Sequence, residues 1–507
     1  MLSSSAVVTW RQGPALVSDR PRTLAGLCAA AAIQAQGRIV FTDETGRTWT
    51  WDQLLVASGR LAYAWSQQVR AGDRIAILVG NGWAHLLAEL AAWRLGAIAA
   101  PLAAIWGDAT CAELLARLEP ALVVRSEAAV AAHGDQGPEA PWYPAVPHTD
   151  CLILFTSGST GAARGVVLSH DNLCSQQAAF AQLWPDFGRG DRVAGYLPWH
   201  HSFGALAERL WVLTRGAHFF TVPGGGRDRD AFLRTLATVR PTVFCSVPKL
   251  HAIAVAAGLP PAGLRWAFSA GAPLSAHVAQ AYAARGIPVV EGWGLTESGP
   301  SATITPRERP WAPGIVGDPI PGVAVGIDAQ QRVLIRGPGV MQRYWRDPVA
   351  TKLCRVDAAG NDAAGNDGAV LISGDLGRWT SMGLALHGRD DQQVKLANGE
   401  KIPVTVLESR FAALPGIIHV VITATPTLTA LIEAETTLSD TDLLAHIATC
   451  HAADPIPWHH VQQVVRISDP LCIERGEITP SHKVVRSAVT ARYQAWLAAG
   501  GPAFRCL

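Results

Sequence analysis

The chain has 507 residues, which is more than one hydrophobic core usually supports, so we expect at least two domains. Hydrophobic residues make up 49% of the sequence and charged residues 16%, a composition that excludes an intrinsically disordered protein. The formal net charge of +1 gives no basic surface for nucleic acid, so we expect no nucleic-acid partner.

The cysteines and the apolar segments predict a cytoplasmic protein with reduced thiols. The nine cysteines are scattered and include no Cys-x-x-Cys pair, which argues against a zinc site or a disulfide framework. Met1–Trp10 lacks the basic start of a signal peptide, and no apolar run reaches the ~20 residues of a transmembrane helix. The eighteen tryptophans indicate either an aromatic core or large apolar pockets, and we favour the core.

Helix-like and strand-like segments alternate along most of the chain. The periodicity predicts helices over 54–69, 83–95, 171–183, 205–214 and 230–239, with strands over 74–79, 96–101, 192–197 and 218–222. This alternation predicts layered α/β subdomains around mostly parallel sheets. Residues 357–361 are repeated at once as 362–366, which we interpret as an expanded surface loop. A second, smaller domain is expected from about Arg389 to the C-terminus.

The segment 152–168 is the most informative part of the chain. An apolar run, Leu152–Phe155, leads into a stretch of glycines and hydroxyl residues that ends at the cation Arg164. Glycines let backbone N–H groups converge on one point, hydroxyls donate to phosphate oxygens, and the guanidinium neutralises charge. A flexible turn has a similar composition, and the P-loop spacing of NTPases is absent. From the residues alone, both a phosphate-binding loop and a turn remain open.

Two later segments have the residue types of a nucleotide site. In Leu197–Gly204 a histidine, His201, follows a strand and a proline turn, although His200 beside it competes for the same role. Glu291–Ser298 combines glycines, Trp293 and a Thr-Glu pair. An indole offers a stacking face for a flat ring, and carboxylate oxygens suit Mg²⁺. A structural histidine and a capped turn are the alternatives.

Six segments together resemble the adenylate-forming superfamily, which includes acyl-CoA synthetases, adenylation domains of peptide synthetases and beetle luciferases. Besides the three above, they are Ser269–Ser275, the Ser373–Arg378 stretch with its Gly-Asp pair followed by Gly388–Lys401, and Gly476–Arg486. They occur in the family's order. The family's phosphate loop usually ends in Pro-Lys-Gly, where this chain has Ala163-Arg164-Gly165, and Trp293 stands where the family usually has Tyr.

The resemblance implies an N-terminal adenylation domain, 1–388, and a mobile α+β C-terminal domain, 389–507, with a hinge near Asp391. It implies ATP, Mg²⁺ and CoA as cofactor, metal and cosubstrate. Catalytic roles are implied for Lys483, His201, Thr296, Glu297 and Arg389. ATP or AMP would contact Thr156, Ser157, Gly158, Ser159, Thr160, Gly161, Arg164, Gly271, Ala272, Pro273, Trp293, Gly294, Thr296, Asp375, Arg389 and Lys483. Glu297 and Thr160 would hold Mg²⁺, and Lys395, Gly399 and Glu400 would lie on the thiol loop.

The implied activity is that of an acid–CoA ligase that forms an acyl-AMP and releases pyrophosphate. The sequence around Lys483 resembles that of the long-chain branch of the family, which favours a fatty or other hydrophobic acid as the substrate. Its pocket is expected to involve Phe203, the 243–247 strand, Ala270 and Gly292. Two alternatives remain open: a ligase that loads the phosphopantetheine arm of a carrier protein, and a weakly active homologue that only binds nucleotide or acyl ligand.

Overall fold

The computed structural model describes residues 8–507 except 104–106, 135–136, 157–162, 227, 259–262, 357–368, 391–392, 396–400, 425–426, 455, 473, 479–483 and 501–502. The chain forms two compact units. The first contains residues up to Ser373 together with Trp379–Ala385, and the second contains Gly374–Arg378 and Leu386–Leu507. The strands β20 (Val370–Thr380) and β21 (Gly383–Arg389) therefore contribute residues to both units.

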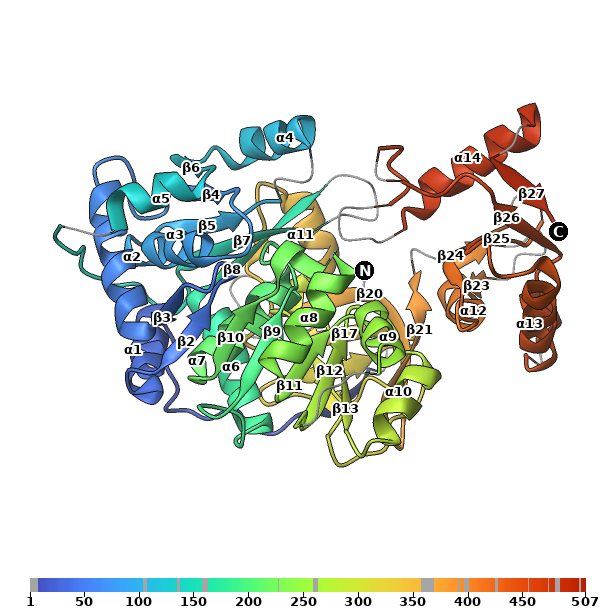
Figure 1. The fold of residues 1–507 in the computed structure, drawn as a ribbon, viewed down its shortest axis with the longest axis horizontal. Helices are drawn as coiled ribbons and strands as arrows, with labels where there is room; N and C mark the ends of the chain where they lie inside the picture. Colours follow the sequence, from blue (N-terminus) through green and yellow to red (C-terminus); the bar gives the residue numbers. More distant parts are fainter. Residues whose placement is uncertain are drawn as a thin grey trace. The chain divides into compact units, whose positions relative to one another are not determined.

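The first sheet of unit 1 has the order β18-β8-β7-β5-β4-β6, with β4, β5, β6 and β7 parallel and β8 antiparallel to β7 (Figure 1). Its strands are β4 (Arg74–Ile77), β5 (Ile98–Pro101), β6 (Leu122–Val124), β7 (Asp150–Thr156), β8 (Arg164–Ser169) and β18 (Arg343–Tyr344). The helices in and around this layer are α2 (Trp51–Trp65), α3 (Trp83–Arg94), α4 (Asp108–Leu118), α5 (Glu127–Gly134) and α11 (Pro348–Cys354).

A second sheet, β3-β2-β10-β9, joins early and middle parts of the chain. Its strands are β2 (Ile39–Thr42), β3 (Thr48–Thr50), β9 (Arg192–Gly195) and β10 (His218–Thr221), and β10 is parallel to both β2 and β9. The accompanying helices are α1 (Leu24–Ala35), α6 (His170–Leu183) and α7 (Trp211–Thr214). The helix expected over 205–214 is an α-helix only in α7, because the preceding η2 (Phe203–Leu210) is a π-helix.

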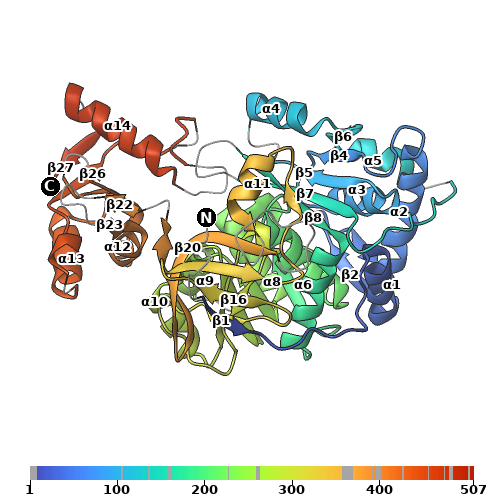
Figure 2. The same cartoon turned by 180° about the vertical axis from the view of Figure 1, so that it is seen from behind.

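The third sheet, β11-β12-β13-β14-β15, begins with three parallel strands. The strands are β11 (Val243–Ser246), β12 (Trp266–Ala270), β13 (Val289–Trp293), β14 (Thr303–Ile304) and β15 (Asp318–Pro319). Helices α8 (Arg229–Val239), α9 (Pro248–Ala256) and α10 (Ala276–Ala283) belong to this layer. Figure 2 shows the remaining sheet from behind, formed by β1 (Thr9–Gln12), β16 (Ala324–Ile327), β17 (Arg332–Arg336), β20 and β19 (Arg355–Val356), with β21 paired to β20.

Unit 2 is an α+β unit with its own core. Its four-stranded sheet has the order β24-β25-β26-β27, with strands β24 (Ile417–Thr423), β25 (Thr429–Ala434), β26 (Gln463–Ile467) and β27 (Phe504–Cys506). A short hairpin, β22 (Gln393–Lys395) and β23 (Lys401–Pro403), precedes the helices α12 (Val404–Phe411), α13 (Asp440–Ala452) and α14 (Arg486–Ala499). No described helix of either unit combines the length and the apolar character needed to cross a bilayer.

A cluster of aromatic rings joins α6, α7 and β12 in unit 1. The ring centroids of Trp184 and Trp266 are 4.7 Å apart, those of Trp184 and Trp211 are 4.8 Å apart, and those of Phe187 and Trp211 are 4.0 Å apart. Trp211 and Trp266 are fully buried. Much of the high tryptophan content therefore lies in the core, as the composition suggested, and it holds the second sheet against the third.

We expect Trp211→Ala to lower the free energy of unfolding of unit 1 by about 3–5 kcal/mol, because it removes a large buried ring and leaves a cavity among its neighbours. Denaturant titration followed by circular dichroism measures the change. Ile33→Ala is the control, since Ile33 is 77% exposed on α1. Equal effects of the two substitutions would contradict the role given to this cluster.

Candidate active site

The segments predicted to contact the nucleotide follow the carboxyl ends of strands. Gly271–Pro273 follows β12, and Trp293 ends β13, its parallel neighbour. Carboxyl ends of parallel strands meet at one edge of a sheet, which is where ligands bind in open α/β sheets. Gly271 has φ +86°, a conformation that favours glycine, and a Cβ added there would lie 3.9 Å from Val247 at the end of β11. The two nucleotide segments and Val247, from the strand expected to border the acid, therefore lie together at one sheet edge.

Glu297, the predicted magnesium ligand, is held by a tyrosine that the sequence analysis did not identify. The Tyr344 hydroxyl donates to Glu297 Oε1 over 2.7 Å, and burial together with this carboxylate raises the pKa of Tyr344. The Arg164 guanidinium lies over the Tyr344 ring at 5.6 Å, and Arg164 Nε is 4.0 Å from Asp347 Oδ2. The Thr156 hydroxyl donates to the Arg164 carbonyl over 3.4 Å. The structure thus brings Arg164 and Glu297 together around Tyr344, and it places Thr156 against the Arg164 backbone.

Thr296, the neighbour of Glu297, contacts the loop that contains His201. Thr296 lies in the short 3-10 helix η4 (Thr296–Ser298), and its Oγ1 is 2.9 Å from Ser202 Oγ. The His201 amide donates to the Pro198 carbonyl over 3.1 Å, and the rings of His200 and His201 are 4.5 Å apart. Both histidines lie beside the predicted nucleotide segment, so the competition between them noted from the sequence persists.

A buried ion pair lies behind the 197–201 loop. Arg209 Nη2 donates to Glu89 Oε2, and both side chains are at most 2% exposed. The Arg209 guanidinium also lies 4.5 Å from the Trp199 ring, which is completely buried. Burial raises the pKa of Glu89 while the Arg209 charge lowers it, and the result is a lowered pKa, so the pair is ionised. Asn81 accepts from the Trp199 amide and donates to the Leu197 carbonyl, which fixes the backbone of the same loop.

Glu291 supports the part of the site formed by β13 and the loop after β12. The sequence analysis assigned no role to this residue. Its Oε1 accepts from the Leu274 amide over 3.1 Å, and its Oε2 accepts from Trp311 Nε1. It therefore ties the loop after β12 to β13. Burial raises the pKa of Glu291 to about 7. A single carboxylate inside the apolar run that ends at Trp293 was the signal that could have indicated this role.

In unit 2, the predicted ribose and hinge segments contact each other. Arg389 Nη1 lies 3.2 Å from Asp375 Oδ1. Gly374 has φ +77°, and a Cβ added there would lie 3.0 Å from Arg389 Nη2, so glycine permits the close approach. Several predicted residues lie outside the described part of the chain: Ser157, Gly158, Ser159, Thr160, Gly161, Asp391, Gly399, Glu400 and Lys483. Lys395 lies in β22, and its side chain is likewise outside the description.

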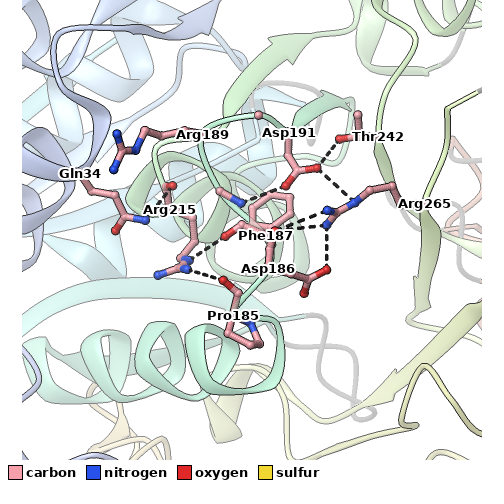
Figure 3. Close-up of a pocket in the computed structure, with 11 residues that line it drawn as sticks. Gln34, Pro185, Asp186, Phe187, Arg189, Asp191, Arg215, Thr242 and Arg265 are labelled. Carbon is pink, nitrogen blue, oxygen red and sulfur yellow. Dashed lines mark hydrogen bonds and ion pairs between the residues drawn. The ribbon is translucent and has the colours of Figure 1, made fainter.

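A surface pocket of about 400 Å³ occupies the opposite end of the strands in unit 1 (Figure 3). Its lining includes residues just before β9, β10, β11 and β12, at the amino ends of parallel strands. Its cations are already paired: Arg265 lies 3.2 Å from Asp186 and 3.5 Å from Asp191, and Arg189 Nη1 donates to Gln36 Oε1 over 2.6 Å. Both its location and its internal pairing separate this pocket from the candidate site.

The described residues contain no group of three or more His, Cys, Asp or Glu side chains that could hold a metal ion. Mg²⁺ commonly binds through one or two carboxylates and substrate phosphates, without a cage made only of protein ligands. The nine cysteines are all free thiols, as expected from their spacing.

Comparison with known proteins identifies the family. Residues 28–345, more than half of the chain, match the AMP-binding enzyme family, and the chain belongs to that family. The resemblance and the α/β adenylate-forming fold expected from the sequence are thereby confirmed.

The relatives of the chain include acid–CoA ligases with different acids. The anthranilate–CoA ligase of Pseudomonas aeruginosa is 25% identical over 457 residues, covering 77% of this chain and 82% of that protein. The long-chain-fatty-acid–CoA ligase FadD15 of Mycobacterium bovis is 25% identical over 421 residues, covering 67% of each. The crystal structure of ATP-bound MatB from Rhodopseudomonas palustris has a TM-score of 0.76, at 22% identity over 92% of this chain and 99% of that chain.

We expect Glu291→Gln to remove a pH dependence of stability. The pKa of Glu291 is about 7 in the folded chain against an ordinary value of 4.5, so the folded state binds its proton more tightly. The contribution of Glu291 to stability is therefore present below pH 4.5 and is lost as the pH rises to 7. Between pH 5 and pH 8 the wild type should lose about 2–3 kcal/mol relative to the variant, measured by denaturant titration. A difference between the two proteins that does not change with pH would contradict this assignment.

Proposed function

We propose that the chain is an ATP-dependent acid–CoA ligase of the AMP-forming type. The observation that carries the proposal is the cluster of Arg164, Tyr344 and Glu297 near Thr296, in a chain of the AMP-binding enzyme family. It combines a cation for phosphate, a carboxylate for a divalent metal and a hydroxyl for the α-phosphate. The acid–CoA ligases among the relatives support CoA as the acceptor.

The proposed reaction has two steps. An oxygen of the substrate carboxylate attacks the α-phosphorus of ATP, the bond to the β-phosphate oxygen breaks, and pyrophosphate leaves. The thiol of CoA then attacks the acyl carbon, AMP leaves, and the thiol proton passes to solvent. No protein nucleophile is needed, so the protein contributes by positioning the reactants and stabilising developing charge.

The residues of unit 1 would divide the work of binding ATP. Arg164 and the loop from Thr156 to Gly161 would hold the β- and γ-phosphates, and Thr296 would contact the α-phosphate. Trp293 would lie against adenine, beside Gly271–Pro273. His201 would orient the incoming carboxylate. Arg164 stands where the family usually has a lysine, and its guanidinium offers a planar set of donors in place of a point charge.

The donor set around Glu297 fits a magnesium ion. The carboxylate is half-buried, it supplies hard oxygen donors, and Tyr344 fixes one of its oxygens. Bound Mg²⁺ would neutralise charge on the ATP phosphates. Thr160, predicted as a second oxygen ligand, lies outside the described residues.

The C-terminal residues would act in turn. Asp375 would accept hydrogen bonds from the ribose hydroxyls, and Arg389 would reach ribose and phosphate. Lys483 would bridge the carboxylate and the α-phosphate in the first step, and the loop with Lys395, Gly399 and Glu400 would serve the thiol in the second. Lys483 and the thiol loop cannot occupy the same site at the same time. We therefore propose that the domain 389–507 rotates about Asp391 between the two steps.

We expect Lys483→Ala to lower the rate of ATP–pyrophosphate exchange by about 100-fold or more, because it removes a cation that stabilises developing charge. Thioester formation from supplied acyl-AMP and CoA should remain near the wild-type rate. Arg285→Ala, which removes an exposed cation of unit 1, is the control. Equal loss in both half-reactions would contradict the role given to Lys483.

We expect Arg164→Ala to raise the Michaelis constant for ATP about tenfold or more, because hydrogen bonds to charged groups contribute about 1.5–3 kcal/mol. Arg164→Lys is the matched variant: it keeps the charge that the family usually has at this position and should recover most of the lost affinity. The measurement is pyrophosphate release at varied ATP concentration. An unchanged Michaelis constant in Arg164→Ala would mean that the cation is dispensable.

A further inference from the structure

An arginine outside the predicted site residues contacts the end of the predicted phosphate-binding loop. Arg117 lies in the last turn of α4, and its Nη1 donates to the Ala163 carbonyl over 2.5 Å. Ala163 immediately precedes Arg164, the cation proposed to hold the β- and γ-phosphates of ATP. The bond joins residues that are 46 positions apart in the chain, so no local sequence pattern indicates it.

Gly165, on the other side of Arg164, is held by Trp345. The Trp345 amide donates to the Gly165 carbonyl over 2.7 Å, and a Cβ added at Gly165 would lie 3.2 Å from Trp345 Cβ. Trp345 Nε1 in turn donates to the Arg117 carbonyl over 3.0 Å. Arg117 and Trp345 are therefore joined to each other, and together they fix the backbone on both sides of Arg164.

The last turn of α4 is itself fixed to the core of unit 1. Leu114 and Leu118 are buried in an apolar cluster with side chains of β7 and β8, and Ala163 packs against the same cluster. Arg74 Nε, at the start of β4, donates to the Leu118 carbonyl over 3.1 Å. Arg117 therefore extends from a fixed helix end, and its hydrogen bond restrains Ala163 relative to that end.

The sequence just before Arg164 explains why such a restraint is needed. The family usually has a proline where this chain has Ala163, and the ring of a proline fixes φ. Alanine has no such ring, so ordering its backbone costs more conformational entropy. The Arg117 guanidinium is charged, and hydrogen bonds from charged donors are stronger than those between neutral groups. Its bond to the Ala163 carbonyl therefore supplies a restraint that the residue type does not.

We propose that Arg117 is a positioning residue for Arg164: it acts through the Ala163 backbone and holds the Arg164 guanidinium where that group receives the β- and γ-phosphates of ATP. This inference rests on the proposed acid–CoA ligase function and adds a residue to the same site. Arg117 should therefore matter for binding ATP and not for binding AMP, which lacks those two phosphates. It should also have no effect on ATP once the Arg164 side chain is removed.

Calorimetric titration with ATP in the presence of Mg²⁺, and separately with AMP, provides the first test and needs no acid substrate. Arg117→Ala should raise the dissociation constant for ATP about three- to tenfold, because one hydrogen bond is lost, and should leave that for AMP unchanged. Arg125→Ala, which removes an exposed cation just after β6, is the control. An unchanged constant for ATP in Arg117→Ala, or an equal rise for ATP and AMP, would overturn the proposal. If Arg117→Ala does not fold, Arg117→Met keeps the apolar stem without the donor and replaces it.

A double-mutant cycle then separates positioning of Arg164 from direct contact between Arg117 and phosphate. The double variant Arg117→Ala, Arg164→Ala should bind ATP within about twofold of Arg164→Ala alone, because Arg117 acts only through Arg164. A further loss equal to that of Arg117→Ala alone would mean that Arg117 contacts the phosphates itself, and it would overturn the proposal. Failure of the wild-type protein to bind either nucleotide would instead count against the proposed ligase function.

Discussion

The candidate site depends on the buried ion pair between Glu89 and Arg209. Glu89 lies on α3 of the first layer and Arg209 on η2 of the second, so the pair joins two layers at the point where Trp199 is fixed. An ion pair with so little exposure is expensive to desolvate, and its loss on one side would leave a buried charge. The ion pair therefore favours a single arrangement of these two layers. That arrangement also fixes the position of the loop that contains His201.

The same arrangement recurs elsewhere in unit 1: a buried or half-buried polar group fixes a segment that the ligand would contact. Tyr344 holds Glu297, Ser202 contacts Thr296, and Glu291 ties the loop after β12 to β13. In each case the supporting residue comes from a different part of the chain than the residue it supports. Preorganisation of this kind suits a reaction in which the protein offers no nucleophile and works through position and charge.

Much of the fold and the composition of the site could be predicted from the sequence, because helix and strand periodicities and glycine-rich turns are local signals. The helices expected over 54–69, 83–95, 171–183 and 230–239 occur as α2, α3, α6 and α8, with ends shifted by a few residues, whereas α4, α5 and β6 were not predicted. Tyr344 and Glu291 were not predicted, because their roles depend on contacts across 47 and 17 residues of chain. The π-helix η2 was not predicted either, since the apolar pattern over 205–214 indicated a helix without specifying its hydrogen-bond register.

The location of Cys245 has a consequence for an enzyme that makes an activated acyl group. An acyl-adenylate is an electrophile that any nearby thiolate could intercept, which would acylate the protein and end its turnover. Burial raises the pKa of Cys245 well above its usual range, and a protonated thiol is a poor nucleophile. Cys245 lies on β11, the strand expected to border the acid, and its complete burial makes it a poor competitor for the thiol of an incoming cosubstrate.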